Sequence, residues 1–400
     1  MPAPIRPDAF PNPSPAPPPL GQLLVSLIVD AEEDFNWSRP VEGTAYSTAC
    51  MHAIGPLQEI LAAYDLPPTY LLTYPVLEDA DAVRLLRRQL DRGRCELGVQ
   101  MHPWVNPPFG TGLDRRLSFP LNLPATVEEA KIVRLAEKFT AVFGFAPRVF
   151  KAGRYGIGAQ TVALLERLGF EIDTSIAPRT NLGAEGGPDF SAYAVHPFWF
   201  GATRRLLEVP VCRDIVGWAG AFAPDFYRPF AGPGPSLGRA VLSWLRIAER
   251  ITLSPEGNDT AAMRRLIRGQ EAAGQRVLTM SFHSSSLAVG HNPYVQSRKE
   301  LHMFYDRLSA VLDGLARRAE TRFAGVPELA RLLVDPAGPP GSGMPASGLP
   351  VSGLALSGLP LSDLAASDRA ATQRTASHRT ASHWIASHRA VPSPAEGRAC

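Results

Sequence analysis

The chain has 400 residues, of which 45% are hydrophobic, and its formal net charge at pH 7 is only +2. This length allows one barrel-sized enzyme domain with tails, or two to three average domains. Charged residues are dispersed along the sequence rather than gathered into a basic face, a pattern that argues against nucleic-acid binding and favours small-molecule partners.

The first residues are rich in proline. Proline fixes φ and lacks a backbone N–H, so we expect residues 1–20 to be a disordered tail rather than a strand or helix. The tail contains no apolar run typical of a signal peptide, and the apolar run at 23–29 is too short to cross a bilayer. The cysteines are scattered, with no paired spacing that indicates a disulfide framework. We therefore expect a cytoplasmic protein without a transmembrane segment.

Strand-like and helix-like segments then alternate along the chain. Apolar or alternating runs predict strands near residues 23–29, 69–73, 95–101, 149–150, 171–176, 206–211, 276–282 and 321–326. Helical spacing predicts helices between them, two of which begin at Ser/Thr-x-x-Glu capping patterns, Thr126 with Glu129 and Ser297 with Glu300. Strands that alternate with helices in this way predict a parallel α/β architecture, closed or nearly closed into a barrel.

The C-terminal part differs again. From about residue 336 the chain is rich in proline, glycine and serine, with Ser-Gly-Leu-Pro units followed by Ala-Ser-His repeats. A period of about five residues fits neither a strand nor a helix, so we expect 336–400 to be a disordered, low-complexity tail. The folded domain is thus predicted to span residues 21–335.

Polar clusters follow five of the predicted strands. Asp30-Ala31-Glu32-Glu33-Asp34 follows the first, and Asp30 and Glu32 share one face of an extended chain. Gln100 and His102 share a face at the end of the third. Lys151 to Tyr155, Asp173, and His283 to Ser286 follow later strands. In parallel barrels the active site lies at the C-terminal ends of the strands, so we predict a functional site there.

This ordered set of segments resembles the polysaccharide deacetylases of carbohydrate esterase family 4, the NodB-homology domain. It is similar to a subgroup with DxEE, ExGxHxHPW, FRAGRYG, DSS and FHSSSL segments, over about residues 21–335. The resemblance implies a distorted (β/α)7 barrel. It also implies a hydrolase of carbon–nitrogen bonds in carbohydrate metabolism, which uses Zn²⁺ or another divalent metal to remove an N-acetyl group from an amino sugar or polysaccharide.

The resemblance also implies roles for single residues. Asp30 corresponds to the general base that takes a proton from metal-bound water. Glu32 and His102 correspond to metal ligands, and Gln100 stands at a third ligand position. A bound divalent metal lowers the pKa of its water toward 7, which provides a nucleophile for amide hydrolysis.

Further matches concern the transition state and the leaving group. Lys151, Arg154 and Tyr155 correspond to a motif in which a cation steadies the catalytic aspartate and a backbone N–H faces the oxyanion. Asp173 corresponds to an acid that orients the catalytic histidine. His283 corresponds to the histidine that protonates the leaving amine.

The remaining site predictions concern substrate contacts. We expect Trp104, Ser284 and Ser285 to contact an N-acetylated sugar, with Trp104 stacking on a sugar ring. Without an export signal, a nucleotide- or lipid-linked sugar precursor fits the sequence better than a cell-wall polymer.

Two positions depart from the family pattern. Gln100 replaces a metal-binding histidine, and an amide oxygen is a poor substitute for imidazole on Zn²⁺. Lys151 replaces an arginine, which keeps the charge but loses the bidentate fork. Three interpretations stay open: a deacetylase with a weakly bound metal, a metal-independent hydrolase of cyclic amides with the same fold, and a carbohydrate-binding pseudoenzyme.

Overall fold

The computed structural model describes residues 10, 13–19, 21–34, 46–110, 114–203, 206–227 and 236–333. Within this part of the chain, parallel strands form one curved sheet in the order β8-β6-β5-β4-β3-β2-β11. Their bounds are β2 (Leu23–Ala31), β3 (Thr69–Leu72), β4 (Glu96–Met101), β5 (Val149–Ala152), β6 (Ile172–Asp173), β8 (Leu206–Glu208) and β11 (Val277–His283). These seven strands include seven of the eight predicted segments.

The opening between β8 and β11 is bridged by single backbone hydrogen bonds. Cys212, four residues after β8, donates to the carbonyl of Thr279 at 3.1 Å and accepts from Leu253 at 2.7 Å. Ser281 in β11 donates in turn to the carbonyl of Leu253 at 3.2 Å. The sheet therefore curls into an irregular ring, which confirms the predicted distorted (β/α)7 barrel.

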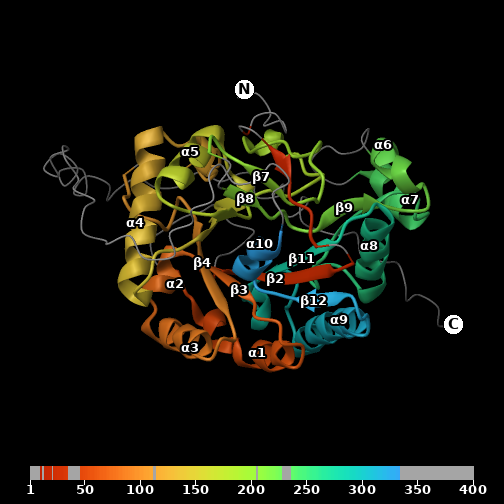
Figure 1. The fold of residues 1–400 in the computed structure, drawn as a ribbon, viewed down its shortest axis with the longest axis horizontal. Helices are drawn as coiled ribbons and strands as arrows, with labels where there is room; N and C mark the ends of the chain where they lie inside the picture. The colour runs from red at the N-terminus through yellow and green to blue at the C-terminus, as the bar shows by residue number, and fades with distance from the viewer. Residues whose placement is uncertain are drawn as a thin grey trace, which may run out of the picture.

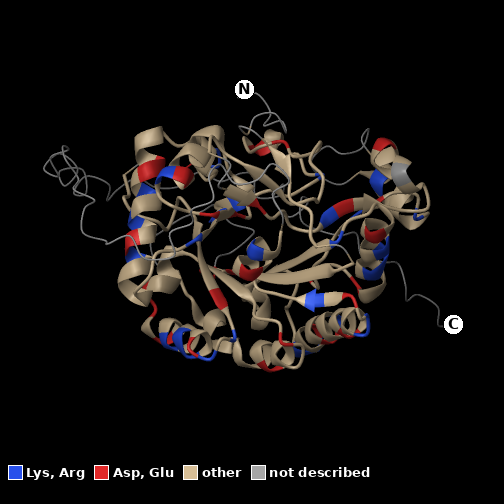
Figure 2. Ribbon diagram, in the orientation of Figure 1, with Lys and Arg blue, Asp and Glu red and all other residues tan. Residues whose placement is uncertain are grey.

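Helices surround this ring (Figure 1). Their bounds are α1 (Gly55–Ala62), α2 (Tyr74–Glu78), α3 (Ala80–Leu90), α4 (Ala125–Phe143), α5 (Ala159–Arg167), α6 (Ala223–Tyr227), α7 (Leu237–Trp244), α8 (Thr260–Ala272), α9 (Arg298–Ala316) and α10 (Val326–Leu332). None of the helices in the described part of the chain is long and apolar enough to cross a membrane. Acidic and basic residues alternate over the outer helices rather than separating into patches of one sign (Figure 2).

Additional strands extend or flank the barrel. The strands β1 (Ser14–Pro15) and β7 (Phe198–Phe200) add antiparallel edges next to β8. The last predicted strand is β12 (Thr321–Phe323), which pairs with the start of β2. A separate antiparallel pair, β9 (Arg213–Val216) and β10 (Glu249–Thr252), was not predicted.

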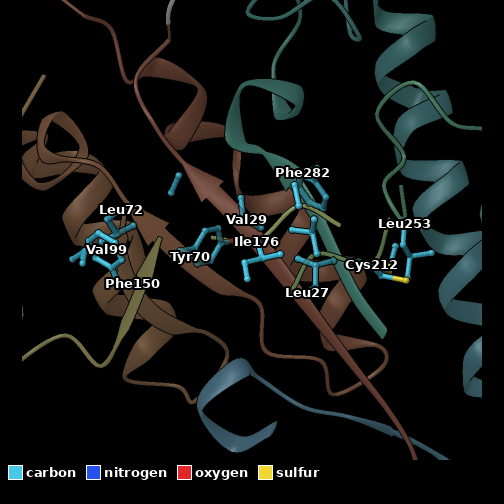
Figure 3. Packing of buried hydrophobic residues seen from close by; sticks show 14 of the residues in the cluster. Leu27, Val29, Tyr70, Leu72, Val99, Phe150, Ile176, Cys212, Leu253 and Phe282 are labelled. Carbon is cyan, nitrogen blue, oxygen red and sulfur yellow. The ribbon is translucent and has the colours of Figure 1, made fainter. Parts of the chain in front are cut away.

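The strands pack on both faces, as their continuous apolar sequences require. Outward-facing residues such as Val29 and its register partner Phe282 join a large cluster under the helices (Figure 3). The intervening residues Leu24 and Ile28 join a smaller cluster with Val326 and Leu329 of α10. That helix lies in the middle of the ring in Figure 1, so it fills one end of the barrel and leaves the polar strand ends at the other.

Two predictions need correction, one about the N-terminal tail and one about the start of α4. The N-terminal tail is not wholly without structure, because Phe10 is 1% exposed and packs against Phe200, with ring centroids 5.2 Å apart. Pro15 pairs within β1, where an edge strand does not require its missing N–H. The Thr126 capping pattern is also wrong, because α4 begins at Ala125 after Pro124. The predicted disordered tail at 336–400 lies outside the described residues.

Other expectations are confirmed. Ser297 caps α9 by accepting from the backbone N–H of Glu300 at 3.2 Å. Gly144 ends α4 with a left-handed φ of 87°, the conformation that favours glycine. The cysteines within the described residues, Cys50, Cys95 and Cys212, are free and buried.

Candidate active site

The parallel register places Asp30 beside His283. The two are direct partners at the C-terminal ends of β2 and β11. His283 Nε2 lies 3.8 Å from Asp30 Oδ2. The two side chains predicted to act as base and acid therefore face each other at the mouth of the barrel.

Lys151, in β5, contacts Asp30, in β2, although two strands lie between them in the sheet. Its Nζ donates to Asp30 Oδ1 at 2.7 Å and to Oδ2 at 2.5 Å, and both side chains are buried. Burial alone would lower the pKa of Lys151, but the charge and hydrogen bond of Asp30, together with Tyr155 and Glu32, outweigh burial and raise it. The ammonium therefore stays charged and contacts both oxygens of the carboxylate, as predicted from the resemblance.

Glu256 holds the Nδ1 side of the His283 ring, away from Asp30, and this residue was not predicted from the sequence. Its Oε2 accepts from His283 Nδ1 at 2.9 Å, and its Oε1 accepts from the His283 backbone N–H at 2.9 Å. Burial alone would lower the pKa of His283, but Glu256, Glu32 and Asp30 outweigh it and raise the pKa to about 10. The imidazole is therefore protonated at neutral pH.

Asp173 does not orient His283, in contrast to the prediction. Its Oδ1 accepts from Ser175 Oγ at 2.6 Å, and that hydroxyl accepts from the backbone N–H of Ala152 at 2.7 Å. Asp173 is the register partner of Glu208, whose pKa is raised well above its ordinary value by burial and by Asp173. Asp173, through Ser175, thus braces the end of β5 that carries Lys151.

The three predicted ligand positions come together beside Asp30. Gln100 Nε2 lies 2.8 Å from His102 Nε2 and donates to Glu32 Oε2 at 3.4 Å. His102 Nε2 lies 3.6 Å from the same carboxylate oxygen. Burial raises the pKa of Glu32 to about 7, and His283 and His102 offset this only in part.

A second acid, Glu33, fixes the ring of His102. Its Oε1 accepts from His102 Nδ1 at 2.9 Å and from Trp104 Nε1 at 2.8 Å. The Trp104 ring stacks on the imidazole, with centroids 4.2 Å apart. On the other side, a Cβ on Gly153 would lie 2.5 Å from His102 Cδ2, so only glycine fits there. Nε2 is thereby directed toward Glu32, the arrangement that orients metal-binding histidines.

These residues fit a divalent cation, with one restriction. Glu32 Oε1 and Gln100 Oε1 are buried acceptors without a hydrogen-bond partner among the described residues, and a cation would satisfy them. The hydrogen bond from Gln100 uses the lone pair of His102 Nε2 that an ion would need. Burial alone would lower the pKa of His102, but Glu33 and Glu32 outweigh it and raise it, so a proton also competes for this nitrogen. Glu32 and His102 would hold the ion, and Gln100 would have to turn its amide.

Another cluster with metal-ligating side chains has a structural explanation. His52, Asp79 and Asp81 lie together near the surface. Asp79 Oδ1 accepts from the backbone N–H of Asp81 at 2.9 Å and caps the start of α3. Its other oxygen accepts from Thr48 Oγ1 at 2.6 Å. Helix capping therefore accounts for Asp79, whose other oxygen also lies 2.9 Å from His52 Nε2.

Arg154 and Tyr155 lie in a strained turn. Both have left-handed φ values, 54° and 58°, which are unfavourable for residues other than glycine and concentrate at functional sites. The guanidinium of Arg154 pairs with Glu185 and lies 4.0 Å from the centre of the Phe119 ring. The Tyr155 ring lies 5.0 Å from Lys151 Nζ. The structure thus brings Tyr155 to the site but directs Arg154 into the neighbouring loop.

The residues predicted to contact substrate are buried. Trp104 is 3% exposed, so its ring is covered rather than open for stacking. Ser284 Oγ accepts from the backbone N–H of Glu32 at 3.1 Å, and Ser285 Oγ accepts from Asn292 Nδ2 at 3.2 Å. In this structure these groups hold the loops of the site in place.

No family model and no curated protein matches the sequence. Among solved structures, a Mycobacterium smegmatis protein assigned to the polysaccharide deacetylases is 17% identical, with 80% of this chain and 93% of that chain covered and a TM-score of 0.45. PuuE allantoinase is 14% identical over 80% of this chain and 93% of its own, with a TM-score of 0.45. A family 4 acetyl xylan esterase from Clostridium thermocellum, solved with a cobalt ion, is 10% identical over 77% and 91%, with a TM-score of 0.36.

Values this low do not establish a shared activity. The strand order and the register of the site residues come from this chain itself. By these features the chain has the distorted (β/α)7 barrel expected of the polysaccharide deacetylases of carbohydrate esterase family 4.

Proposed function

We propose that this chain is a hydrolase that removes the N-acetyl group from an amino sugar. The observation that carries the proposal is the pair formed by Asp30 and His283, 3.8 Å apart and supported from opposite sides by Lys151 and Glu256. One group is a carboxylate held beside a cation, and the other is an imidazolium held beside a carboxylate. Amide hydrolysis needs such a base and acid in one site.

Asp30 is proposed to act as the base. Its carboxylate accepts a proton from water while the oxygen of that water adds to the carbonyl carbon of the amide. Lys151 contacts both carboxylate oxygens and so holds the aspartate in place with a positive charge beside it. A divalent cation held by Glu32 and His102, when bound, would lower the pKa of that water and polarise the carbonyl.

His283 is proposed to act as the acid. Its Nδ1 proton is held by Glu256, so the proton that can leave is the one on Nε2, on the side of Asp30. This proton passes to the nitrogen as the carbon–nitrogen bond breaks. The products are acetic acid and the amine, between which a proton transfers in solvent to give acetate and an ammonium group, and the proton on Asp30 returns to His283 through solvent.

The identity of the N-acetylated sugar is also part of this proposal. A nucleotide- or lipid-linked N-acetylated sugar is the substrate class we favour. A second candidate function is hydrolysis without a metal at the same site, for which cyclic amides are the alternative substrates. The hydrogen bond between Gln100 and His102 favours this candidate, because it occupies the nitrogen that a metal would need.

The test is release of acetate from a panel of free, nucleotide-linked and lipid-linked N-acetylated amino sugars, with and without added Zn²⁺. Asp30→Asn should abolish release, and Asp306→Asn on the exposed side of α9 is the matched control. Release that requires Zn²⁺ supports the metal-dependent deacetylase. Ring opening of a cyclic amide in the presence of a chelator would favour the second candidate, and binding of sugars without any turnover would contradict both.

A further inference from the structure

Most of the large apolar side chains exposed within the described residues lie in one segment between β9 and β10. We call this set the apolar patch; it consists of Trp218, Phe222, Phe226, Leu237, Val241, Trp244 and Leu245. Leu237 is 83% exposed, Trp218 72% and Trp244 71%. Scattered exposed apolar residues are ordinary, but seven such side chains within one short segment indicate an interaction surface.

Helix α7 shows the feature most clearly. Leu237, Val241 and Trp244 recur at spacings of four and three residues, which places them on one helix face. None of its residues is buried. The helix is properly started, because Ser236 Oγ accepts from the backbone N–H of Arg239. A helix of this pattern normally turns its apolar face toward the protein core, and here that face is turned to solvent.

The patch belongs to a formed part of the structure. Beneath it, Ile215, Ala223, Tyr227 and Ala248 make a small buried cluster of their own. Trp218 Nε1 donates to the carbonyl of Leu245 at 3.0 Å, which ties the end of β9 to the end of α7. Figure 1 shows α6 and α7 together at one corner of the molecule, outside the ring of strands. The exposed side chains therefore surround a local core without being needed to build it.

We propose that the apolar patch docks on the surface of an anionic lipid bilayer. Tryptophan favours the boundary between headgroups and acyl chains, and two of the seven side chains are tryptophans. Among the described residues from 218 to 246 the only acid is Asp225, against the two arginines Arg239 and Arg246. An amphipathic surface with this charge suits anionic lipid.

A second copy of the chain is a less suitable occupant. In a two-fold dimer the same patch meets itself, so the arginines of one copy would face those of the other. Because no helix of the described residues can cross a membrane, the predicted association is peripheral. It does not depend on which reaction the barrel catalyses.

The experiment is co-sedimentation of the full chain with phosphatidylcholine vesicles, with and without phosphatidylglycerol. We expect binding to the anionic vesicles, weakened by added salt, with a blue shift of tryptophan fluorescence. The double variant Leu237→Glu, Trp244→Glu should bind at least roughly a hundredfold more weakly, because two apolar side chains no longer enter the bilayer. The matched control is Val289→Glu, Met303→Glu, which changes exposed apolar residues elsewhere and should bind as the unmodified chain does.

Three results would overturn the proposal. The unmodified chain would fail to sediment with either vesicle, or the double variant would bind as well as the control variant. The third result is that light scattering shows a dimer for the unmodified chain and a monomer for the double variant, while neither binds vesicles. That result would assign the patch to a second copy of the chain. A thermal unfolding curve is recorded for each variant, and the outward-facing positions predict unchanged midpoints.

Discussion

Replacement of Glu256 by glutamine tests the arrangement around His283 without any knowledge of the substrate. Glutamine keeps the size of the side chain, and its oxygen can still accept from the His283 backbone N–H and from Ser286 Oγ. The amide NH₂, which is a donor, then faces His283 Nδ1. In the unmodified chain the carboxylate of Glu256 accepts a hydrogen bond from that nitrogen. The variant therefore favours the neutral imidazole with its proton on Nε2.

The size of the effect follows from the lost contact. A hydrogen bond to a charged partner contributes about 1.5–3 kcal/mol, and one pH unit of pKa corresponds to about 1.4 kcal/mol. The pKa of His283, raised to about 10 in the unmodified chain, should thus fall by about one to two pH units. Since the acid must be protonated, the alkaline limb of any activity profile should move to lower pH by the same amount.

The free energy of unfolding should also depend on pH through the titration of His283. The folded-state pKa of His283 lies above its ordinary value of 6.5. Its contribution to stability is therefore fully present below about pH 6.5 and is lost as the pH rises toward 10. In Glu256→Gln the pKa of His283 in the folded state is lower, so this contribution to stability should be lost at a lower pH.

The assay is titration of the histidine ring signals by NMR, with His283→Gln used to assign the resonance. Asp306→Asn, which also removes one negative charge but on the exposed side of α9, serves as a control for general charge effects. An unchanged His283 pKa in Glu256→Gln would refute the reasoning, because it would mean that Glu256 does not hold the ring in solution.

Three further changes have defined outcomes. Asp30→Asn should abolish turnover by at least about 10²-fold, the usual contribution of a general base, while metal content measured by atomic emission stays unchanged. Gln100→His should raise Zn²⁺ affinity, measured by competition with a chromophoric chelator, because it adds a nitrogen ligand; unchanged affinity would place Gln100 outside the ligand set. Lys131→Met should lower the free energy of unfolding by about 3 kcal/mol in denaturant titrations, because Nζ donates to the carbonyls of Pro103 and Pro108 at 3.0 and 2.7 Å. A loss below about 1 kcal/mol would show that water replaces these contacts.

The sequence was sufficient to predict the site residues that sit on strands. Asp30, Gln100, Lys151 and His283 follow apolar runs, and the parallel register brings such residues to one end of the barrel. Alternation along a strand also predicts correctly that Gln100 points into the barrel, since it alternates with Val99 in the outer cluster.

Glu256 was out of reach for a reason that lies in the topology. It follows β10, a strand outside the barrel sheet, so the rule of strand ends did not select it. Its partnership with His283 depends on the loop returning from the β9–β10 pair, which no local pattern encodes. The resemblance implies that role for Asp173, which does lie at a strand end. There its side chain accepts from Ser175 Oγ, beside its register partner Glu208, and no contact with His283 is among its hydrogen bonds in the described residues.

The two departures from the family pattern have unequal consequences. Gln100 and Lys151 are register partners on β4 and β5, so both lie beside Asp30. Lysine loses the fork of arginine, yet Nζ reaches both oxygens of Asp30 at 2.7 and 2.5 Å, so the charge contact is retained. The amide oxygen of glutamine is a poorer metal ligand than an imidazole nitrogen, and the Gln100 N–H also occupies the nitrogen of His102. We therefore expect the residue at position 100, rather than the one at 151, to decide whether this barrel works with a metal.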